Sequence, residues 1–276
     1  MRAALLQLGS SDDPAQNAAT VRAMLRTAVS DGAGFVLTPE VTNCVSQSRS
    51  HQRAVLGPEA QDPVLIMARE EAARAGVWVA LGSIAVTTDD PDGRFANRSI
   101  LIGPDGAIAA RYDKVHMFDV QVNETETFRE SAGFRPGDRL ATAETPFGTV
   151  GLSVCYDIRF AGLYRRLAQA GADILLVPAA FSPVTGAAHW APLLRARAIE
   201  CGAWVLAAAQ TGDHPVSTGK PRRTWGHAMA VSPWGEVRLD MGEEPGIGYL
   251  EIDPGEVAEA RRRIPSLDHD RKVIGP

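Results

Sequence analysis

Three polar residues suited to acid–base and nucleophilic chemistry, Glu40, Lys114 and Cys155, each close an apolar run of the sequence. The runs are GFVLTPE, IAARYDK and VGLSVC. A carboxylate can act as a general base, an ammonium can stabilise an oxyanion, and a thiol can attack a carbonyl carbon. Because ligands of α/β sheets bind at the carboxyl ends of strands, we expect the three groups to meet at one sheet edge. Each also has an ordinary alternative, as a core thiol, a solvated acid or a strand-end lysine.

The surroundings of these groups lead to specific expectations about their pKa values. Cys155 precedes a helix expected to begin near Arg159, and a helix N-terminus and a nearby ammonium favour thiolate over thiol. The N–H of Tyr156 could help to hold an oxyanion. Partial desolvation at a strand end should raise the pKa of Glu40, as suits a general base that works near neutral pH.

The elements that must position these groups alternate along the chain. Apolar runs at 2–8, 35–40 and 77–86 predict buried strands, and a 3.6-residue periodicity at 12–34 and 62–76 predicts the helices between them. A β-α-β-α-β order implies parallel strands with right-handed crossovers.

The rest of the chain adds antiparallel strands and then resumes the alternation. Residues 99–114 predict two strands about a Pro-Asp-Gly turn. Residues 115–138 show little periodicity and predict a long functional loop. Further strands are expected at 149–155, 173–181, 203–210, 226–239 and 246–253, and helices at 161–171, 188–202 and 254–264.

More than about ten strands are difficult to hold in one twisted open sheet. The predicted fold is therefore α/β, a four-layer α-β-β-α sandwich of two mixed sheets. No composition break or short-period repeat divides the sequence, so we expect one domain over 1–276, with a core at about 1–264 and a polar C-terminal tail at 265–276.

Composition excludes several classes of function. The formal net charge is -5 and the basic residues form no stripe, which argues against nucleic acid and anionic membranes as partners. No apolar run approaches the roughly 20 residues of a membrane span and no signal peptide is evident, so the sequence predicts a cytoplasmic protein. The 3 cysteines predict no disulfide framework. The sequence contains no HExxH and no phosphate-loop spacing, so we expect no metal and no cofactor.

Cysteine chemistry of the papain type needs a histidine base, and none of the 6 histidines lies in a recognisable signature. Five segments instead carry a family resemblance: LTPE at Glu40, RYDKVHMFDV at Lys114, VCYDIRF at Cys155, TGAAHWAPLLRARAIE from Thr185 and WGHAMAVSPWGEV from Trp225. With them the chain resembles the nitrilase or carbon-nitrogen hydrolase superfamily. CYDIRF with the HW and LLRARAIE segments is similar to the branch that contains deaminated-glutathione amidase and ω-amidase.

The resemblance implies roles for individual residues. It makes Glu40 the general base, Lys114 the oxyanion stabiliser and Cys155 the nucleophile. It also makes Glu130 a second active-site glutamate, which orients the lysine and the substrate amide. Arg159, Phe181 and Thr185 match substrate-contacting positions of the branch, and Arg159 could pair with a substrate carboxylate.

The resemblance further implies the α-β-β-α sandwich, a homodimer or higher homo-oligomer, and an amidohydrolase activity. The expected substrate is a small primary amide that carries a carboxylate or keto acid, of the deaminated glutathione or α-ketoglutaramate type, cleaved to acid and ammonia through a Cys155 thioester. Alternatives are an N-carbamoyl amino acid hydrolase, a nitrilase, or an inactive scaffold of the same fold. Ala161 and Gly162 depart from the Pro-Glu that follows this motif in many relatives.

Overall fold

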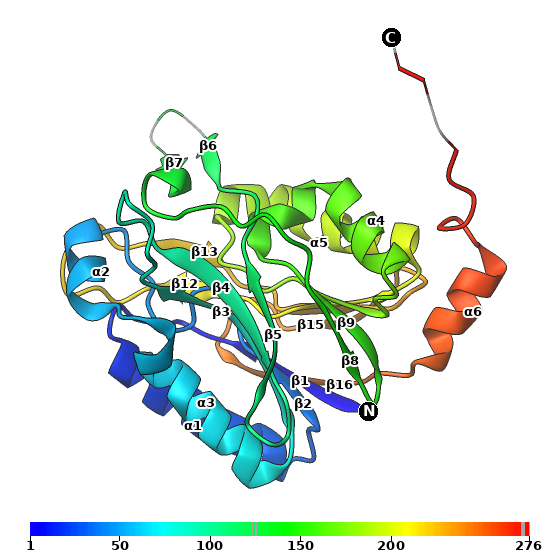
Figure 1. Ribbon diagram of the computed structural model, residues 1–276, viewed down its shortest axis with the longest axis horizontal. Helices are drawn as coiled ribbons and strands as arrows, with labels where there is room; N and C mark the ends of the chain where they lie inside the picture. The colour runs from blue at the N-terminus through cyan, green and yellow to red at the C-terminus, as the bar shows by residue number, and fades with distance from the viewer. Residues whose placement is uncertain (123, 125, 272–273, 276) are drawn as a thin grey trace.

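Two six-stranded mixed sheets lie face to face between layers of helices (Figure 1). The computed structural model describes residues 1–122, 124, 126–271 and 274–275. The first sheet has the order β16 (Gly246–Glu251), β1 (Arg2–Gln7), β2 (Phe35–Leu37), β3 (Trp78–Val86), β4 (Ala96–Ile102) and β5 (Ile108–Asp113). The second has the order β15 (Val237–Asp240), β14 (Met229–Val231), β11 (Trp204–Ala207), β10 (Ile174–Leu176), β9 (Gly148–Leu152) and β8 (Thr142–Thr145).

Helices cover the outer face of each sheet (Figure 1). The first sheet is covered by α1 (Pro14–Ser30) and α3 (Pro63–Ala75), and the second by α4 (Ala161–Gln169) and α5 (Pro183–Cys201). The remaining elements are α2 (Arg49–Val55), α6 (Gly255–Arg263), the 3-10 turns η1 (Glu59–Gln61), η2 (Glu130–Ala132) and η3 (Cys155–Arg159), and the short strands β6 (Asp119–Gln121), β7 (Thr127–Arg129), β12 (Thr211–Asp213) and β13 (Arg223–Trp225). The layers confirm the predicted four-layer sandwich.

The alternation of side chains along β1 explains why the sheet is buried on both faces. Ala3 and Leu5 belong to the core between the two sheets, whereas Ala4 and Leu6 pack against the layer of α1 and α3. Each fully buried leucine contributes roughly 2 kcal/mol by removal of apolar surface from water. Strands β1, β2 and β3 pair in parallel, as the alternating sequence predicts.

Local signals fix where the first helix begins. The Asp13 carboxylate accepts hydrogen bonds from the N–H groups of Ala15 and Gln16, and Pro14 occupies the first turn. These features satisfy backbone donors that have no partner inside the helix. The helix therefore begins where the Asp-Asp-Pro sequence predicts.

The structure also differs from the expectations at four places. The expected loop at 115–138 contains the β6–β7 hairpin, and α2 was not predicted because its seven residues carry no apolar stripe. Helix α5 begins at Pro183, five residues before its predicted start, which places Thr185 on a helix. Strands β2 and β9 end at Leu37 and Leu152, three residues before Glu40 and Cys155 respectively.

Candidate active site

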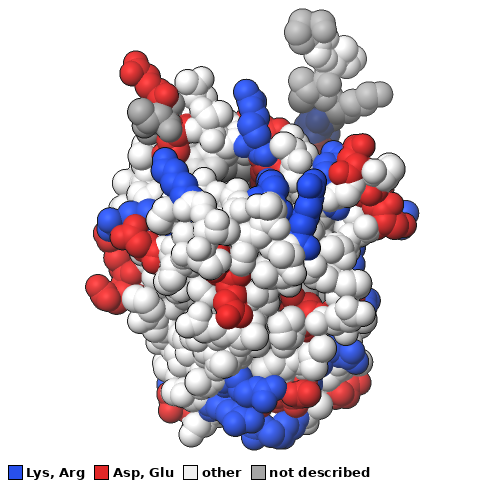
Figure 2. All heavy atoms as spheres, turned by 90° about the vertical axis from the view of Figure 1, so that its left-hand side faces the viewer, with Lys and Arg blue, Asp and Glu red and all other residues white. Residues whose placement is uncertain are grey.

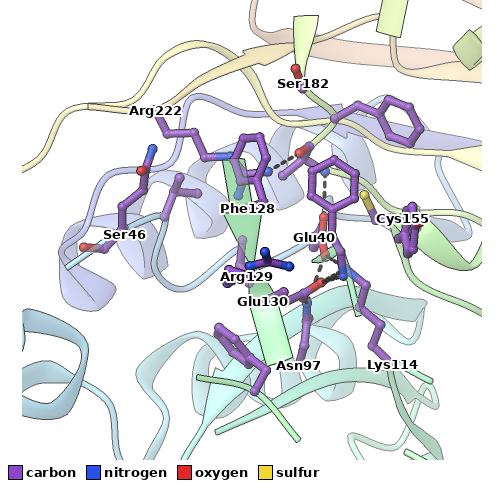
Figure 3. A pocket seen from close by; sticks show the side chains of 18 of the residues that line it. Glu40, Ser46, Asn97, Lys114, Phe128, Arg129, Glu130, Cys155, Ser182 and Arg222 are labelled. Atoms are coloured by element: carbon purple, nitrogen blue, oxygen red, sulfur yellow. Dashed lines mark hydrogen bonds and ion pairs between the residues drawn. The ribbon is translucent and has the colours of Figure 1, made fainter. Parts of the chain in front are cut away.

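A pocket of about 300 Å³ brings together all four predicted catalytic residues (Figure 3). Glu40 follows β2, Lys114 follows β5, Glu130 opens η2 and Cys155 opens η3. Segments that are distant in sequence therefore converge at one edge of the stacked sheets. In Figure 3 the side chains of Glu40, Lys114 and Cys155 point toward one another.

Cys155 lies in a strained turn rather than at the end of a strand. Its φ is 51°, in the left-handed region that residues other than glycine rarely adopt. The Cys155 N–H donates to Pro178 O at 2.9 Å, and the Val154 N–H donates to Asp157 Oδ2 at 2.9 Å. Strain of this kind costs about 1–3 kcal/mol and persists where surrounding contacts fix the backbone. The turn presents the sulfur to the pocket.

Lys114 is held between two carboxylates. Its Nζ lies 2.8 Å from Glu40 Oε1 and 2.9 Å from Glu130 Oε2, and only 2% of the lysine is exposed. Burial alone would lower the pKa of Lys114, but Glu130 and Glu40 raise it above its usual value. The lysine is therefore a fixed cation throughout the range in which proteins are stable.

Glu40 uses both carboxylate oxygens. Oε1 accepts from Lys114 and from Asn97 Nδ2 at 2.9 Å, and Oε2 accepts from the Ala180 N–H at 2.9 Å. Burial would raise the pKa of Glu40, but Lys114 and Arg222 act more strongly together and hold it below its usual value. The expected rise in the pKa of Glu40 was therefore wrong, because neighbouring cations outweigh desolvation.

Cys155 shows the opposite behaviour. The pKa of its thiol lies well above the usual value, first through burial and then through the Glu40 carboxylate, while Lys114 acts in the other direction. The expectation that thiolate is favoured was therefore wrong for the resting site. A neutral thiol beside an ionised carboxylate is therefore the stable pair in the resting site.

Glu130 anchors the lysine from the other side. Its Oε1 and Oε2 lie 3.0 and 2.9 Å from Lys114 Nζ, and Oε2 also accepts from the Phe118 N–H at 2.7 Å. Asn97 Nδ2 reaches Glu130 Oε1 at 3.3 Å. These contacts hold Glu130 beside Lys114, and its role as the orienting carboxylate stays a prediction.

The predicted substrate-contacting residues divide into two groups. Tyr156, Phe181 and Thr185 line the pocket, and the Tyr156 N–H has no acceptor among the hydrogen bonds of the described residues, as an oxyanion donor requires. Arg159 is not part of the lining. Its guanidinium lies over the rings of Tyr156 and Phe181, at 5.9 and 5.6 Å, and its Nη2 lies 3.3 Å from His189 Nδ1.

Sequence reasoning missed several residues of this pocket. Asn97, which contacts both glutamates, occurs in an N-x-S triplet that carries no catalytic signal. Arg49, Arg129 and Arg222 also line the pocket, from α2, β7 and the segment before β13. None of these arginines follows a predicted strand, so only the folded chain shows that they belong to the site.

The pocket carries an excess of positive charge. Within the described part of the chain, Arg49, Arg129 and Arg222 form no ion pair with a carboxylate, whereas Lys114 is paired to both glutamates. Arg222 Nη2 donates to the Ala180 carbonyl. In Figure 2, where the side that carries α2 faces the viewer, Lys and Arg side chains gather around a hollow near the top. The pocket therefore favours an anionic ligand.

Two further searches bear on the type of site. Over the described ranges, no three His, Cys, Asp or Glu side chains are grouped so that they could hold a metal ion. In the same part of the chain, no helix combines the length and the apolar character needed to cross a membrane.

Comparison with known proteins gives a consistent result. Residues 2–262 match the family described as Carbon-nitrogen hydrolase. The chain is 40% identical over 275 residues to deaminated glutathione amidase of Yersinia enterocolitica, covering 98% of this chain and 93% of that protein. It is 36% identical over 276 residues to the human omega-amidase NIT2, covering 99% of this chain and 96% of that protein.

A solved structure supports the same assignment. The crystal structure of the C. elegans NitFhit protein superposes with a TM-score of 0.89 at 34% identity, over 98% of this chain. This chain spans 65% of that longer protein. A family match over nearly the whole chain, together with the convergence of Glu40, Lys114 and Cys155, shows that the chain belongs to the carbon-nitrogen hydrolase family of the nitrilase superfamily.

Proposed function

We propose that this carbon-nitrogen hydrolase cleaves the amide of a small substrate that carries a carboxylate or keto acid, through a thioester on Cys155. The observation that carries the proposal is the position of Lys114 Nζ, 2.8 Å from Glu40 and 2.9 Å from Glu130 in the pocket that also contains the Cys155 thiol. This arrangement supplies a base, a fixed cation and a nucleophile without further groups.

The first half of the reaction acylates the enzyme. Glu40 takes the thiol proton as the Cys155 sulfur bonds to the carbonyl carbon, and the oxygen becomes an oxyanion near Lys114 and the Tyr156 N–H. When the tetrahedral intermediate collapses, the carbon–nitrogen bond breaks and Glu40 gives its proton to the departing nitrogen. A thioester and an amine or ammonia result.

The second half releases the acid. Water attacks the thioester carbon while Glu40 accepts a water proton, and collapse of the new tetrahedral intermediate breaks the carbon–sulfur bond. The proton on Glu40 returns to the Cys155 sulfur, which restores the thiol and the carboxylate. The low pKa of Glu40 and the high pKa of the Cys155 thiol match this starting state.

The nature of the leaving group depends on the substrate. A primary amide such as α-ketoglutaramate releases ammonia. Deaminated glutathione contains secondary amides, so its hydrolysis releases an amine, and the expectation of ammonia applies only to the primary amides. The similarity to proteins named deaminated glutathione amidase and omega-amidase supports both substrate types for this chain.

Charge in the pocket supports the carboxylate on the substrate. Four cations line it, Lys114, Arg49, Arg129 and Arg222, against the carboxylates of Glu40 and Glu130. A substrate carboxylate would give these arginines an ion-pair partner. The planar guanidinium can donate two parallel hydrogen bonds to the two oxygens of a carboxylate. Arg129 lies at the exposed side of the site, so we assign it the first contact with an incoming anion.

A substrate panel tests the proposal. Purified protein is incubated with α-ketoglutaramate, deaminated glutathione, an N-carbamoyl amino acid, a nitrile and a neutral amide, and ammonia, free amine and acid products are quantified. We expect turnover of the first two and little of the neutral amide. Cys155→Ala should abolish turnover and retain the circular dichroism spectrum. Preference for the carbamoyl compound or the nitrile, or full activity of Cys155→Ala, would contradict the proposal.

We also propose that the chain forms a homodimer through the outer face of α5. Val184 and Ile199 on this helix are each 54% exposed, and Phe160, which lies before α4, is 37% exposed, so this side of the molecule offers apolar side chains to a partner. Sedimentation analysis should give a dimer, and Val184→Glu with Ile199→Glu should shift it to monomer. A wild-type monomer at micromolar concentration would exclude this interface.

A further inference from the structure

The carboxylate of Asp157 is fully buried and accepts four hydrogen bonds. Its Oδ2 accepts from Tyr112 Oη at 2.7 Å and from the Val154 N–H at 2.9 Å. Its Oδ1 accepts from the His116 N–H at 3.0 Å and lies 2.7 Å from His116 Nδ1. A buried carboxylate is costly unless such partners surround it, so the cluster is stable only when all the donors are in place.

The donors come from the two segments that carry the reacting groups. Tyr112 and His116 lie two residues before and two residues after Lys114, and Val154 directly precedes Cys155. The Asp157 carboxylate therefore binds the lysine segment on both sides of Lys114. It also binds the turn that carries Cys155, at the residue before the cysteine. Asp157 itself lies outside the pocket lining, so it has no direct contact to offer the substrate.

We infer that Asp157 is a positioning residue that fixes the Lys114 ammonium relative to the Cys155 sulfur. The inference rests on the proposed function, because its consequence is measured on the proposed reaction. The lysine segment leaves the sheet where β5 ends at Asp113, and the Lys114 N–H makes its last bond to the neighbouring strand β4. Apart from Asp157, backbone contacts to this segment come from Lys114 N–H to Asn97 O at 2.9 Å and from Gly137 N–H to Lys114 O at 2.8 Å.

We call the four hydrogen bonds of Asp157 the brace. The strain in the Cys155 turn makes the brace necessary. Cys155 has a φ of 51°, and the Asp157 bond to the Val154 N–H lies one residue before it. Without that acceptor the turn could relax and move the sulfur. A shift of about 1 Å between reacting groups can cost on the order of 100-fold in rate, even when the fold is retained. The effect should therefore appear in kcat rather than in KM.

A matched tyrosine pair separates positioning from simple stability. Tyr112→Phe removes the hydroxyl that donates to Asp157, and Tyr164→Phe removes an equally buried hydroxyl that lies 2.7 Å from Ser153 Oγ. Both variants lose one buried hydrogen bond. We expect Tyr112→Phe to lower kcat about tenfold or more with KM within twofold of wild type, and Tyr164→Phe to keep kcat within twofold at a similar loss in Tm.

A histidine pair tests the other side of the lysine. His116→Leu removes both the side-chain donor and the ring that stacks on Phe160, whereas His116→Asn loses the ring but keeps a donor near the position of Nδ1. We expect the decrease in log kcat relative to wild type to be at most half as large for His116→Asn as for His116→Leu. Asp157→Asn is the direct variant, and we expect it to lower kcat about 100-fold. If this variant does not fold, the tyrosine pair and the histidine pair test the positioning role instead.

A second readout is independent of the substrate. Alkylation of Cys155 by iodoacetamide, followed by peptide mass spectrometry, reports how easily the thiol loses its proton beside Lys114. We expect Tyr112→Phe and His116→Leu to slow it about tenfold at pH 8, while Tyr164→Phe and His116→Asn leave it unchanged. If the alkylation rates follow this pattern but no amide is turned over, the proposed function is refuted and the positioning role of Asp157 is retained. Wild-type kcat and alkylation in folded Tyr112→Phe and His116→Leu would overturn the brace.

Discussion

At the scale of single residues, the site depends on one proton held between Glu40 and Cys155. Lys114 and Arg222 lower the pKa of the carboxyl, and burial with Glu40 raises the pKa of the thiol. The proton therefore rests on the Cys155 sulfur, and the Glu40 carboxyl, which we propose as the general base, is ionised before substrate binds. A site built in this way needs no free thiolate, which protects the cysteine from adventitious oxidation.

The lowered pKa of Glu40 predicts the acid limb of the pH profile. The base is active when deprotonated, so kcat/KM should stay on its plateau as pH falls to the ordinary carboxyl pKa of 4.5 and decline only below it. The raised pKa of Lys114 keeps the alkaline side free of a lysine limb up to 10.5. Measurements of kcat/KM in the pH range where circular dichroism shows a folded protein check this, and an acid limb near pH 6 would contradict it.

Removal of the carboxylate gives a separate prediction. Glu40→Gln should lower kcat by roughly 10²–10⁴-fold.

Arginine variants test which guanidinium recognises the substrate. Arg129→Gln should raise KM for an anionic amide about tenfold and leave a neutral amide unaffected, because Arg129 lines the pocket without an ion pair in the described structure. Arg159→Gln is the matched control, since the Arg159 guanidinium lies over the rings of Tyr156 and Phe181 and is not part of the pocket lining. A larger effect at Arg159 would favour the carboxylate contact that the sequence suggested.

At the scale of elements, the site is formed by the segments that follow the ends of strands. Gly82 in β3 shows how closely the segments after β2 and β10 approach each other. A Cβ at this position would lie 2.0 Å from Thr38 O, 2.6 Å from Pro39 O and 2.4 Å from Pro178 Cβ. Those neighbours belong to the segments that carry Glu40 and the Ala180 N–H. The glycine therefore permits the contact between the two sheets that holds Glu40, the proposed general base.

Gly82→Ala should reduce both stability and activity. Overpacking against backbone atoms typically costs 1–3 kcal/mol, and here the displaced segments include Glu40. Gly162→Ala in α4 is the control, because a Cβ there meets no atom within 4 Å and alanine favours helix by up to about 1 kcal/mol. Thermal unfolding and kcat of the two variants give the comparison. A Gly82→Ala protein with wild-type Tm and kcat would show that the segments can move apart freely.

At the scale of the whole molecule, a buried histidine connects a segment near the N-terminus with two segments from the last third of the sequence. His214 is buried, its Nδ1 lies 2.8 Å from Ser10 O, and its Nε2 lies 2.7 Å from Thr224 Oγ1. Because the Ser10 carbonyl can only accept, Nδ1 carries a proton in this contact. Burial first, and then Arg222, lowers the pKa of His214 to about 4.

This histidine predicts acid lability of the fold. Between the unfolded pKa of about 6.5 and the folded value of about 4, the unfolded state binds more protons than the folded state, so stability falls as pH falls. The full loss is roughly 3 kcal/mol, and the contribution is fully present above pH 6.5. Urea unfolding at pH 7, 5.5 and 4.5 measures it, and His214→Gln should flatten the dependence over this range. Equal slopes for the two proteins would contradict this role.

The sequence by itself determined the main alternation of strands and helices, the layers of the sandwich and the three candidate groups that meet in the pocket. These follow from local signals: apolar runs, the Asp-Pro start of α1, and motifs in which Glu40, Lys114 and Cys155 follow strands. The single-domain organisation, the homodimer and the cytoplasmic location stay predictions, as do the roles of the individual site residues. The polar tail lies partly outside the described residues.

Only the tertiary structure decided the charge state of the site and the full set of its lining residues. A pKa depends on neighbours across space, and Arg222 acts on Glu40 from 182 positions further along the chain. Asn97, Asp157 and the pocket arginines likewise gain their places from packing between segments, which leaves no periodic trace in the sequence. Local patterns encode elements, whereas the electrostatics of a site arise only when those elements meet.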